Sequence, residues 1–153
     1  MNLAPAALSL SLALALALSL ALGPASAARA AEPTPQDRYA AQCVAALEAS
    51  ADELARQVRD GKDAARQPLL DQLTFGVAFL GDSYLHGQAN EDQARALVHQ
   101  AELAQRSLSP AELAARQALC ASEGARLLAN ANVLERAVVK RLARKRMDKL
   151  LGT

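Results

Sequence analysis

Hydrophobic residues recur at intervals of three and four along most of the chain after residue 30. Such spacing places them on one side of a helix. In the first segment, Thr34 before Pro35 is typical of a helix start, and Gly61 is typical of a helix end. We therefore predict a helix between these signals, with Cys43 at the edge of its apolar stripe. The stripe consists of Ala40, Val44, Leu47, Ala51, Leu54 and Val58.

A second segment has the same spacing and is expected to begin near Pro68 and to end at Gly87. Its stripe consists of Leu69, Leu73, Val77, Leu80 and Tyr84. Helical spacing favours a helix here. A short buried strand over the FGVAFL run at 75–80 is the alternative that the local sequence leaves open.

A third helix is expected after Asn90, which can cap it, with Gln93 at the position of a capping box. Ser109 followed by Pro110 and Glu112 marks a fourth start. From there a heptad seam predicts either one long helix or two helices joined near 130–132. The seam consists of Leu113, Cys120, Gly124, Leu127, Ala131, Leu134 and Val138.

Composition supports a helical fold. Hydrophobic residues make up 52% of the chain but aromatic residues only 3%, so the apolar content is mostly Ala and Leu. The predicted fold is all-α, a compact bundle of four or five antiparallel helices with a long C-terminal helix, in one domain at 34–151. Ala and Gly at several seam positions should let the helices approach closely.

The first charged residue is Arg29, and an uncharged tract rich in Ala, Leu and Ser precedes it. Such a tract with an A-x-A site at 25–27 is typical of a secretory signal peptide. We predict a signal peptide at 1–27, with cleavage as late as residue 30 as the other option, and a periplasmic or secreted protein. Because the run is long enough to span a bilayer, an uncleaved N-terminal membrane anchor is the alternative.

Cys43 and Cys120 are the two cysteines of the chain. In an oxidising compartment, an even pair in a small domain most simply forms one disulfide. Neither cysteine belongs to a C-x-x-C motif, so redox chemistry and c-type haem attachment are not indicated. We predict a structural disulfide that ties the first helix to the last.

The C-terminal run is strongly basic. From residue 108 onward nine Lys or Arg face four Asp or Glu, whereas residues 30–107 carry seven against twelve. The simpler interpretation is that these cations complement the helix dipole and keep the helix soluble. The functional interpretation is contact with a protein partner, a second copy or an anionic envelope surface. The cations are Lys140, Arg141, Arg144, Lys145, Arg146 and Lys149.

Residues 77–87, VAFLGDSYLHG, resemble the first conserved block of the GDSL (SGNH) hydrolases. That resemblance implies a catalytic serine at Ser83 after a strand of an α/β fold. The family's Gly-x-Asn-Asp and Asp-x-x-His motifs have no counterpart in this chain, and a serine without a base and a carboxylate is a weak nucleophile. We therefore interpret the block as a chance match and predict that the protein is not an enzyme.

Residues 78–104 resemble one Sel-like repeat, a helical hairpin of the TPR type. Gly81, Tyr84, Gly87 and Asp92 carry the similarity, although one residue is missing between Gly87 and Asp92 and the unit occurs once. The resemblance implies a hairpin in which Gly81 allows close packing of the paired helix. It also implies a role as a protein-interaction scaffold.

The remaining features indicate no cofactor and no metal, because His86 and His99 lack the spacing of a ligand motif. Nucleic acid is not an expected partner of an exported chain whose basic run has no aromatic residues for stacking. We predict a protein-binding, scaffold or envelope-maintenance factor. A small periplasmic chaperone is the alternative, because residues 108–117 resemble the L-T-x-x-Q motif of such proteins, although Glu112 replaces the Gln.

Overall fold

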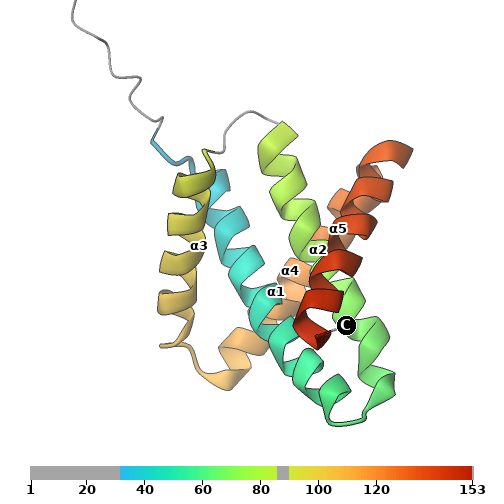
Figure 1. The fold of residues 1–153 in the computed structure, drawn as a ribbon. Coiled ribbons are helices and arrows are strands. Elements are labelled where there is room, and N and C mark those ends of the chain that lie inside the picture. The colour runs from blue at the N-terminus through green and yellow to red at the C-terminus, as the bar shows by residue number, and fades with distance from the viewer. Residues whose placement is uncertain (1–31, 86–89, 153) are drawn as a thin grey trace, which may run out of the picture. The chain divides into compact units, whose positions relative to one another are not determined.

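The computed structural model describes residues 32–85 and 90–152, which belong to one compact unit. Over these residues the chain forms five α-helices and one short 3-10 turn, without a strand. The predicted all-α bundle is confirmed (Figure 1). The helices are α1 (Pro35–Arg59), α2 (Arg66–Leu85), α3 (Glu91–Gln105), α4 (Pro110–Asn130) and α5 (Val133–Leu151), and the 3-10 turn is η1 (Asp63–Ala65).

Local side-chain chemistry sets the helix starts. At α1, the backbone N–H of Asp37 donates to Thr34 Oγ1 (3.1 Å), and the N–H of Thr34 donates back to Asp37 Oδ2 (2.8 Å). This capping box satisfies two amides that the helix leaves unpaired. The pairs Thr34–Asp37, Ser109–Glu112 and Asn132–Glu135 form such boxes. Asn90 caps α3 as predicted, with its side chain accepting from the N–H of Asp92.

The helix ends agree with the sequence signals less closely. Gly61 lies just after α1 with φ +85°, a conformation that favours glycine. α2 begins at Arg66, slightly earlier than expected from Pro68, because η1 leads directly into it. The predicted stop at Gly87 lies outside the described residues. The strand alternative for 75–80 is wrong, since this run is the middle of α2.

α1 lies at the centre of the bundle and packs against α2, α3, α4 and α5. α2 runs antiparallel to it and α3 lies along its other side (Figure 1). The α1 stripe predicted from spacing is largely buried, and its residues belong to both core clusters. One cluster contains Ala40, Cys43, Val44, Ala46, Leu47, Phe79 and Cys120. The other contains Ala51, Ala55, Val58, Ala65, Leu69, Leu73 and Ala143.

α2 and α4 approach each other closely at Gly124. A Cβ added to Gly124 would lie 2.6 Å from Cβ of Phe75 and 3.1 Å from its backbone. Only a residue without a side chain fits there. The prediction that small seam residues permit close helix packing is borne out at this position.

α4 and α5 are two helices, which decides the alternative left open by the sequence. Ala131 has ψ 148°, an extended conformation that ends α4, and Asn132 caps the next helix. The predicted seam does not cross this break. Leu134 and Val138 are 74% and 49% exposed, whereas Val139 and Ala143 are buried in their place. The prediction that Leu134 and Val138 continue the seam is wrong, because the extended Ala131 ends the helix and the heptad register does not carry over into α5.

α3 packs against α1, and Gly81 of α2 faces α5, where an added Cβ would lie 4.0 Å from Val139 Cγ2. The Sel-like resemblance implies a different arrangement, in which the helices before and after Gly87 pack on each other. Gly87 lies outside the described residues, and nothing is described of the Tyr84 side chain. The relation to that repeat family stays a prediction.

Candidate functional site

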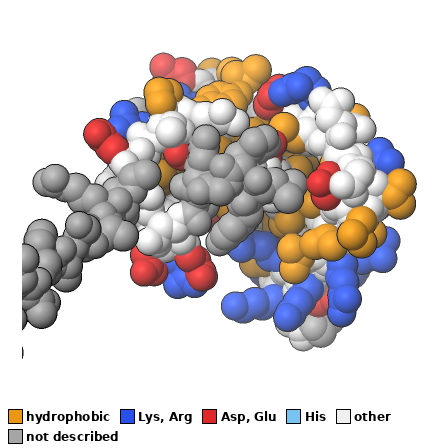
Figure 2. All heavy atoms as spheres, turned by 90° about the horizontal axis from the view of Figure 1, so that it is seen from above, with side chains coloured by type: hydrophobic (Ala, Val, Ile, Leu, Met, Phe, Trp, Pro, Cys, Tyr) orange, Lys and Arg blue, Asp and Glu red, His pale blue; other side chains and the backbone are white. Residues whose placement is uncertain are grey.

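The outward side of α5 carries exposed apolar side chains beside exposed cations, and we call it the α5 outer face. Val133 and Leu134 are 77% and 74% exposed, and Val138 and Leu142 are each 49% exposed. Figure 2 shows Lys and Arg side chains gathered beside hydrophobic ones on the side of the molecule that α5 occupies. The exposed cations of this face are Lys140, Arg141, Arg144, Lys145 and Lys149.

Helical geometry places these two kinds of side chain in adjacent rows. Residues four apart lie one above the other on a helix. Leu134, Val138 and Leu142 therefore form an apolar row, while Arg141, Lys145 and Lys149 form a cationic row next to it. The result is a mixed apolar and cationic face along the length of α5.

The opposite side of α5 holds the helix on the bundle. Val139 is 8% exposed and Ala143 is fully buried, and Ala143 packs in the same cluster as Leu69 and Leu73 of α2. α5 thus has apolar side chains on two sides. One of these sides packs against the bundle, and the other is exposed to solvent.

The excess positive charge lies in α5 and not in α4. α5 contains seven Lys or Arg and two Asp or Glu, whereas α4 contains two of each. The imbalance seen from residue 108 onward is therefore confined to a single helix. Its field is concentrated on one side of the molecule.

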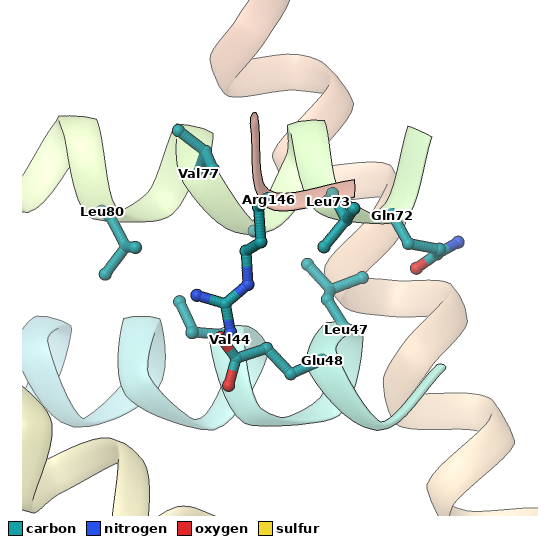
Figure 3. Close-up of a pocket in the computed structure, with 9 residues that line it drawn as sticks. Val44, Leu47, Glu48, Gln72, Leu73, Val77, Leu80 and Arg146 are labelled. Atoms are coloured by element: carbon teal, nitrogen blue, oxygen red, sulfur yellow. Dashed lines mark hydrogen bonds and ion pairs between the residues drawn. The ribbon is translucent and has the colours of Figure 1, made fainter. Parts of the chain in front are cut away.

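Arg146 differs from the other five cations that the sequence grouped with it. Its guanidinium forms an ion pair with Glu48 of α1, across 98 positions of sequence. Figure 3 shows its side chain extending from α5 between α1 and α2 to reach that carboxylate. Arg59 Nη1 donates to the carbonyl of Leu150 (2.8 Å) and makes a second polar attachment of α5 to α1. Arg146 thus serves to attach α5, and the outer face is left with five cations.

Burial raises the pKa of the Glu48 carboxyl, and the nearby carboxylates of Glu102 and Asp52 add to this effect. The Arg146 guanidinium opposes the shift and is outweighed by burial. The pair therefore sits in a partly desolvated position, where the charged carboxylate is costly to keep.

Beside this pair lies a cavity of about 20 Å³, lined by Val44, Leu47, Leu73, Val77 and Leu80, among others (Figure 3). This volume is that of one water molecule. An organic substrate does not fit in it. The cavity is a packing gap beneath the Arg146 side chain.

The residues that could have carried catalysis or metal binding do not form a cluster in the described part of the chain. Ser83 lies within α2, and its side chain is not described. His99 Nδ1 lies 3.6 Å from Glu102 Oε2 on an exposed side of α3. Over the described residues no group of three metal-ligating side chains is found. His86 lies outside those residues.

Cys43 and Cys120 meet in the core between α1 and α4. The prediction that the disulfide ties the first helix to the last is wrong in this respect, because the chain after residue 108 divides into α4 and α5 and Cys120 lies in α4. Their sulfur atoms are 2.08 Å apart, at bonding distance, and the Cα atoms are 5.1 Å apart. Both residues are buried, at 0% and 1% exposure. A pair this deep is inaccessible to a substrate and has the geometry of a structural cross-link.

The cations of the α5 outer face follow directly from counting charges in the sequence. The heptad spacing, by contrast, predicts Leu134 and Val138 in the core, whereas both are exposed. The sequence signal for their exposure is the Asn132–Glu135 capping pair, which marks the start of a new helix and so interrupts the heptad register. The Glu48–Arg146 pair had no local signal, since its members are far apart in sequence.

A search of the described residues for a helix long and apolar enough to span a bilayer finds none. The predicted signal peptide, and with it the anchor alternative, lies outside those residues. Comparison of the chain with protein-family models, curated proteins and solved structures finds no match.

Proposed function

We propose that this protein is an exported, non-enzymatic binding protein of the cell envelope and that the α5 outer face is its binding surface. The observation that carries the proposal is the exposure of Val133, Leu134, Val138 and Leu142 on one helix. Contiguous apolar side chains in water, bordered by polar ones, mark interaction surfaces. Burial against a partner would recover roughly 25 cal/mol for each Å² of apolar surface removed from water.

The non-enzymatic part of the proposal is supported by the α2 region. A catalytic serine in the GDSL arrangement follows the end of an apolar strand and acts together with a base and an orienting carboxylate. Asp82 and the backbone of Ser83 lie inside a helix that runs from Arg66 to Leu85. The Glu48–Arg146 cavity also has room for only one water molecule.

Export is supported by the uncharged tract before Arg29 and by the cysteine pair. Disulfides persist in oxidising compartments such as the periplasm and are rare in the cytosol. Sulfur atoms at bonding distance in the core agree with such a compartment.

The test is envelope association in a bacterial host that expresses the full chain. We expect the exported protein to sediment with the envelope fraction, and Leu134→Gln with Val138→Gln to shift it to the soluble fraction. Leu119→Gln with Leu103→Gln is the matched control, since these residues are 60% and 47% exposed on α4 and α3. If both double variants sediment like the unmodified protein, α5 is not the binding surface.

A second assay addresses catalysis. We expect no hydrolysis of short acyl esters that depends on Ser83. Turnover that disappears in Ser83→Ala would overturn the non-enzymatic assignment.

A chaperone for unfolded clients is the alternative function, and it would use the same exposed apolar side chains. It predicts suppression of the aggregation of a denatured client. Because client binding of that kind is mainly apolar, this activity would survive replacement of Arg141, Lys145 and Lys149 by Gln. Loss of binding in that triple variant favours the charge-dependent envelope function.

A further inference from the structure

We infer that the partner of the α5 outer face is the surface of an anionic phospholipid bilayer, with α5 lying in the plane of the head groups. This inference rests on the proposed function and adds the chemistry of the ligand. It joins two properties of one helix, its exposed apolar row and its exposed cations.

The first step is geometric. α5 has 19 residues, so it is about 28 Å long at the rise of an α-helix. Its apolar row of Leu134, Val138 and Leu142 points away from the bundle, as their exposures of 74%, 49% and 49% show. A helix with this arrangement can place its apolar row at the boundary between head groups and acyl chains, which is how interfacial helices bind.

The second step concerns charge. The cationic row of Arg141, Lys145 and Lys149 lies next to the apolar row, and the exposed Lys140 and Arg144 lie beyond it, on the side away from the apolar row. Long Lys and Arg side chains can leave their stems along apolar surface while the charged ends reach phosphate oxygens. The mixed face therefore complements the surface of an anionic bilayer, in which the phosphate groups lie outside the apolar acyl chains.

The third step compares this ligand with a second copy of the chain. Several acidic side chains elsewhere on the molecule already pair with a cation of their own helix, as Glu53–Arg56, Glu91–Arg95 and Glu123–Arg126 show. Two copies that joined α5 to α5 would bring like charges together, which is unfavourable. A phosphate surface avoids this repulsion.

The lipid assignment predicts a specific dependence on charge. Each Lys or Arg near an anionic membrane strengthens binding roughly fivefold. Replacing Arg141, Lys145 and Lys149 by Gln should weaken binding about 100-fold. Binding should also fall as salt is raised above physiological strength, since screening shortens the reach of these charges to about 8 Å at 0.15 M.

The experiment measures co-sedimentation of the purified exported protein with vesicles at physiological salt. One set of vesicles contains phosphatidylglycerol and phosphatidylethanolamine, and the other contains only phosphatidylcholine. The matched control for charge is Lys62→Gln, Arg66→Gln and Arg106→Gln, which removes three exposed cations from elsewhere on the molecule. The N-terminal segment is the same in every variant, so it does not affect the comparison.

A fluorescence measurement gives a second readout. The chain has no Trp, so Val138→Trp introduces a single reporter on the apolar row, and Leu119→Trp introduces one on exposed α4 as the control. We expect the emission of the Trp at 138 to shift to shorter wavelength with anionic vesicles, and that of the Trp at 119 to stay unchanged.

Binding to anionic vesicles that the α5 triple variant loses and the control triple variant keeps would support the lipid assignment. Three outcomes would overturn it: the protein binds both kinds of vesicle equally, both triple variants lose binding equally, or the protein does not bind vesicles. If vesicles fail but α5-dependent sedimentation with the envelope persists and is sensitive to protease treatment of the envelope, the partner is a protein. In that case the proposed function stands without the lipid. If the α5 variants still sediment with the envelope, the proposed function itself fails.

Discussion

α4 and α5 follow each other in the chain and are similar in length, at 21 and 19 residues, yet they differ in charge and in the exposure of their apolar side chains. α4 has balanced charge and is fixed to the core through Cys120 and Gly124. α5 has a large excess of cations and presents four exposed apolar residues to solvent. α4 is therefore fixed in the core, whereas α5 packs against the bundle with one side and leaves apolar side chains of its other side in solvent.

The strongest test of the role of α4 is removal of its link to α1. Cys43→Ala with Cys120→Ala should lower the free energy of unfolding by about 4 kcal/mol, because the loop of 77 residues gains entropy in the unfolded chain. Urea unfolding of the oxidised protein and of the double variant measures this. Alkylation under denaturing, non-reducing conditions is the control, and two reactive thiols in the unmodified protein would show that the disulfide is not formed.

The next effect concerns the contact between α4 and α2. Gly124→Ala should destabilise the fold by about 2 kcal/mol, because the new Cβ would lie 2.6 Å from Phe75 and force the helices apart. Gly76→Ala is the matched control within α2, since its Cβ would meet Leu47 Cβ at 4.0 Å, an ordinary contact. It should gain roughly 0.5–1 kcal/mol from helix propensity. Equal effects in thermal unfolding would mean that α2 and α4 do not pack this closely.

Features that depend on neighbouring residues in the chain could be predicted from the sequence, whereas contacts between helices could not. Capping pairs such as Ser109–Glu112 lie three residues apart, so their chemistry is local and can be read directly from the chain. The spacing of the α1 stripe likewise predicted which side of that helix is buried. The partner of Gly124 could not be predicted, because Phe75 comes from another helix and the distance depends on the packing of the whole bundle.

The α5 outer face marks a second limit of sequence reasoning. Hydrophobic spacing shows that Leu134 and Val138 lie on one side of a helix, but it does not say whether a neighbouring helix covers that side. A heptad seam can be followed only while the helix continues. One extended residue, Ala131, was enough to move these side chains from the predicted core to the surface.

The break between α4 and α5 can itself be tested. Asn132→Ala removes the side chain that accepts the N–H of Glu135 at the start of α5 (2.9 Å), and it should cost about 1 kcal/mol. Asn130→Ala is the control, because Asn130 is exposed at the end of α4 and Ala is the better helix former. Chemical unfolding of both variants measures the difference. A loss in Asn130→Ala as large as that in Asn132→Ala would show that the cap does not define the break.

The smallest expected effect concerns the ion pair that attaches α5 to α1. Burial raises the pKa of Glu48, so the folded state holds that proton more tightly than the unfolded chain does. Its contribution to stability is present in full below the unfolded pKa and is lost as the pH rises through the raised folded pKa. Glu48→Gln lacks this dependence. Its unfolding free energy should therefore rise relative to that of the unmodified protein as the pH rises above 4.5, the ordinary pKa of a glutamate.

Glu53→Gln provides a control of opposite sign on the same helix. The hydrogen bond from the Gln57 side chain, together with the Arg56 charge, lowers the pKa of the Glu53 carboxyl. That contribution is present above the unfolded pKa and is lost as the pH falls through the lowered folded pKa. Relative to the unmodified protein, Glu53→Gln should thus lose stability as the pH rises toward the unfolded pKa of about 4.5, whereas Glu48→Gln gains stability as the pH rises above that value. Urea unfolding on both sides of this pH measures the two slopes, and slopes of the same sign would mean that the Glu48 carboxyl is not desolvated.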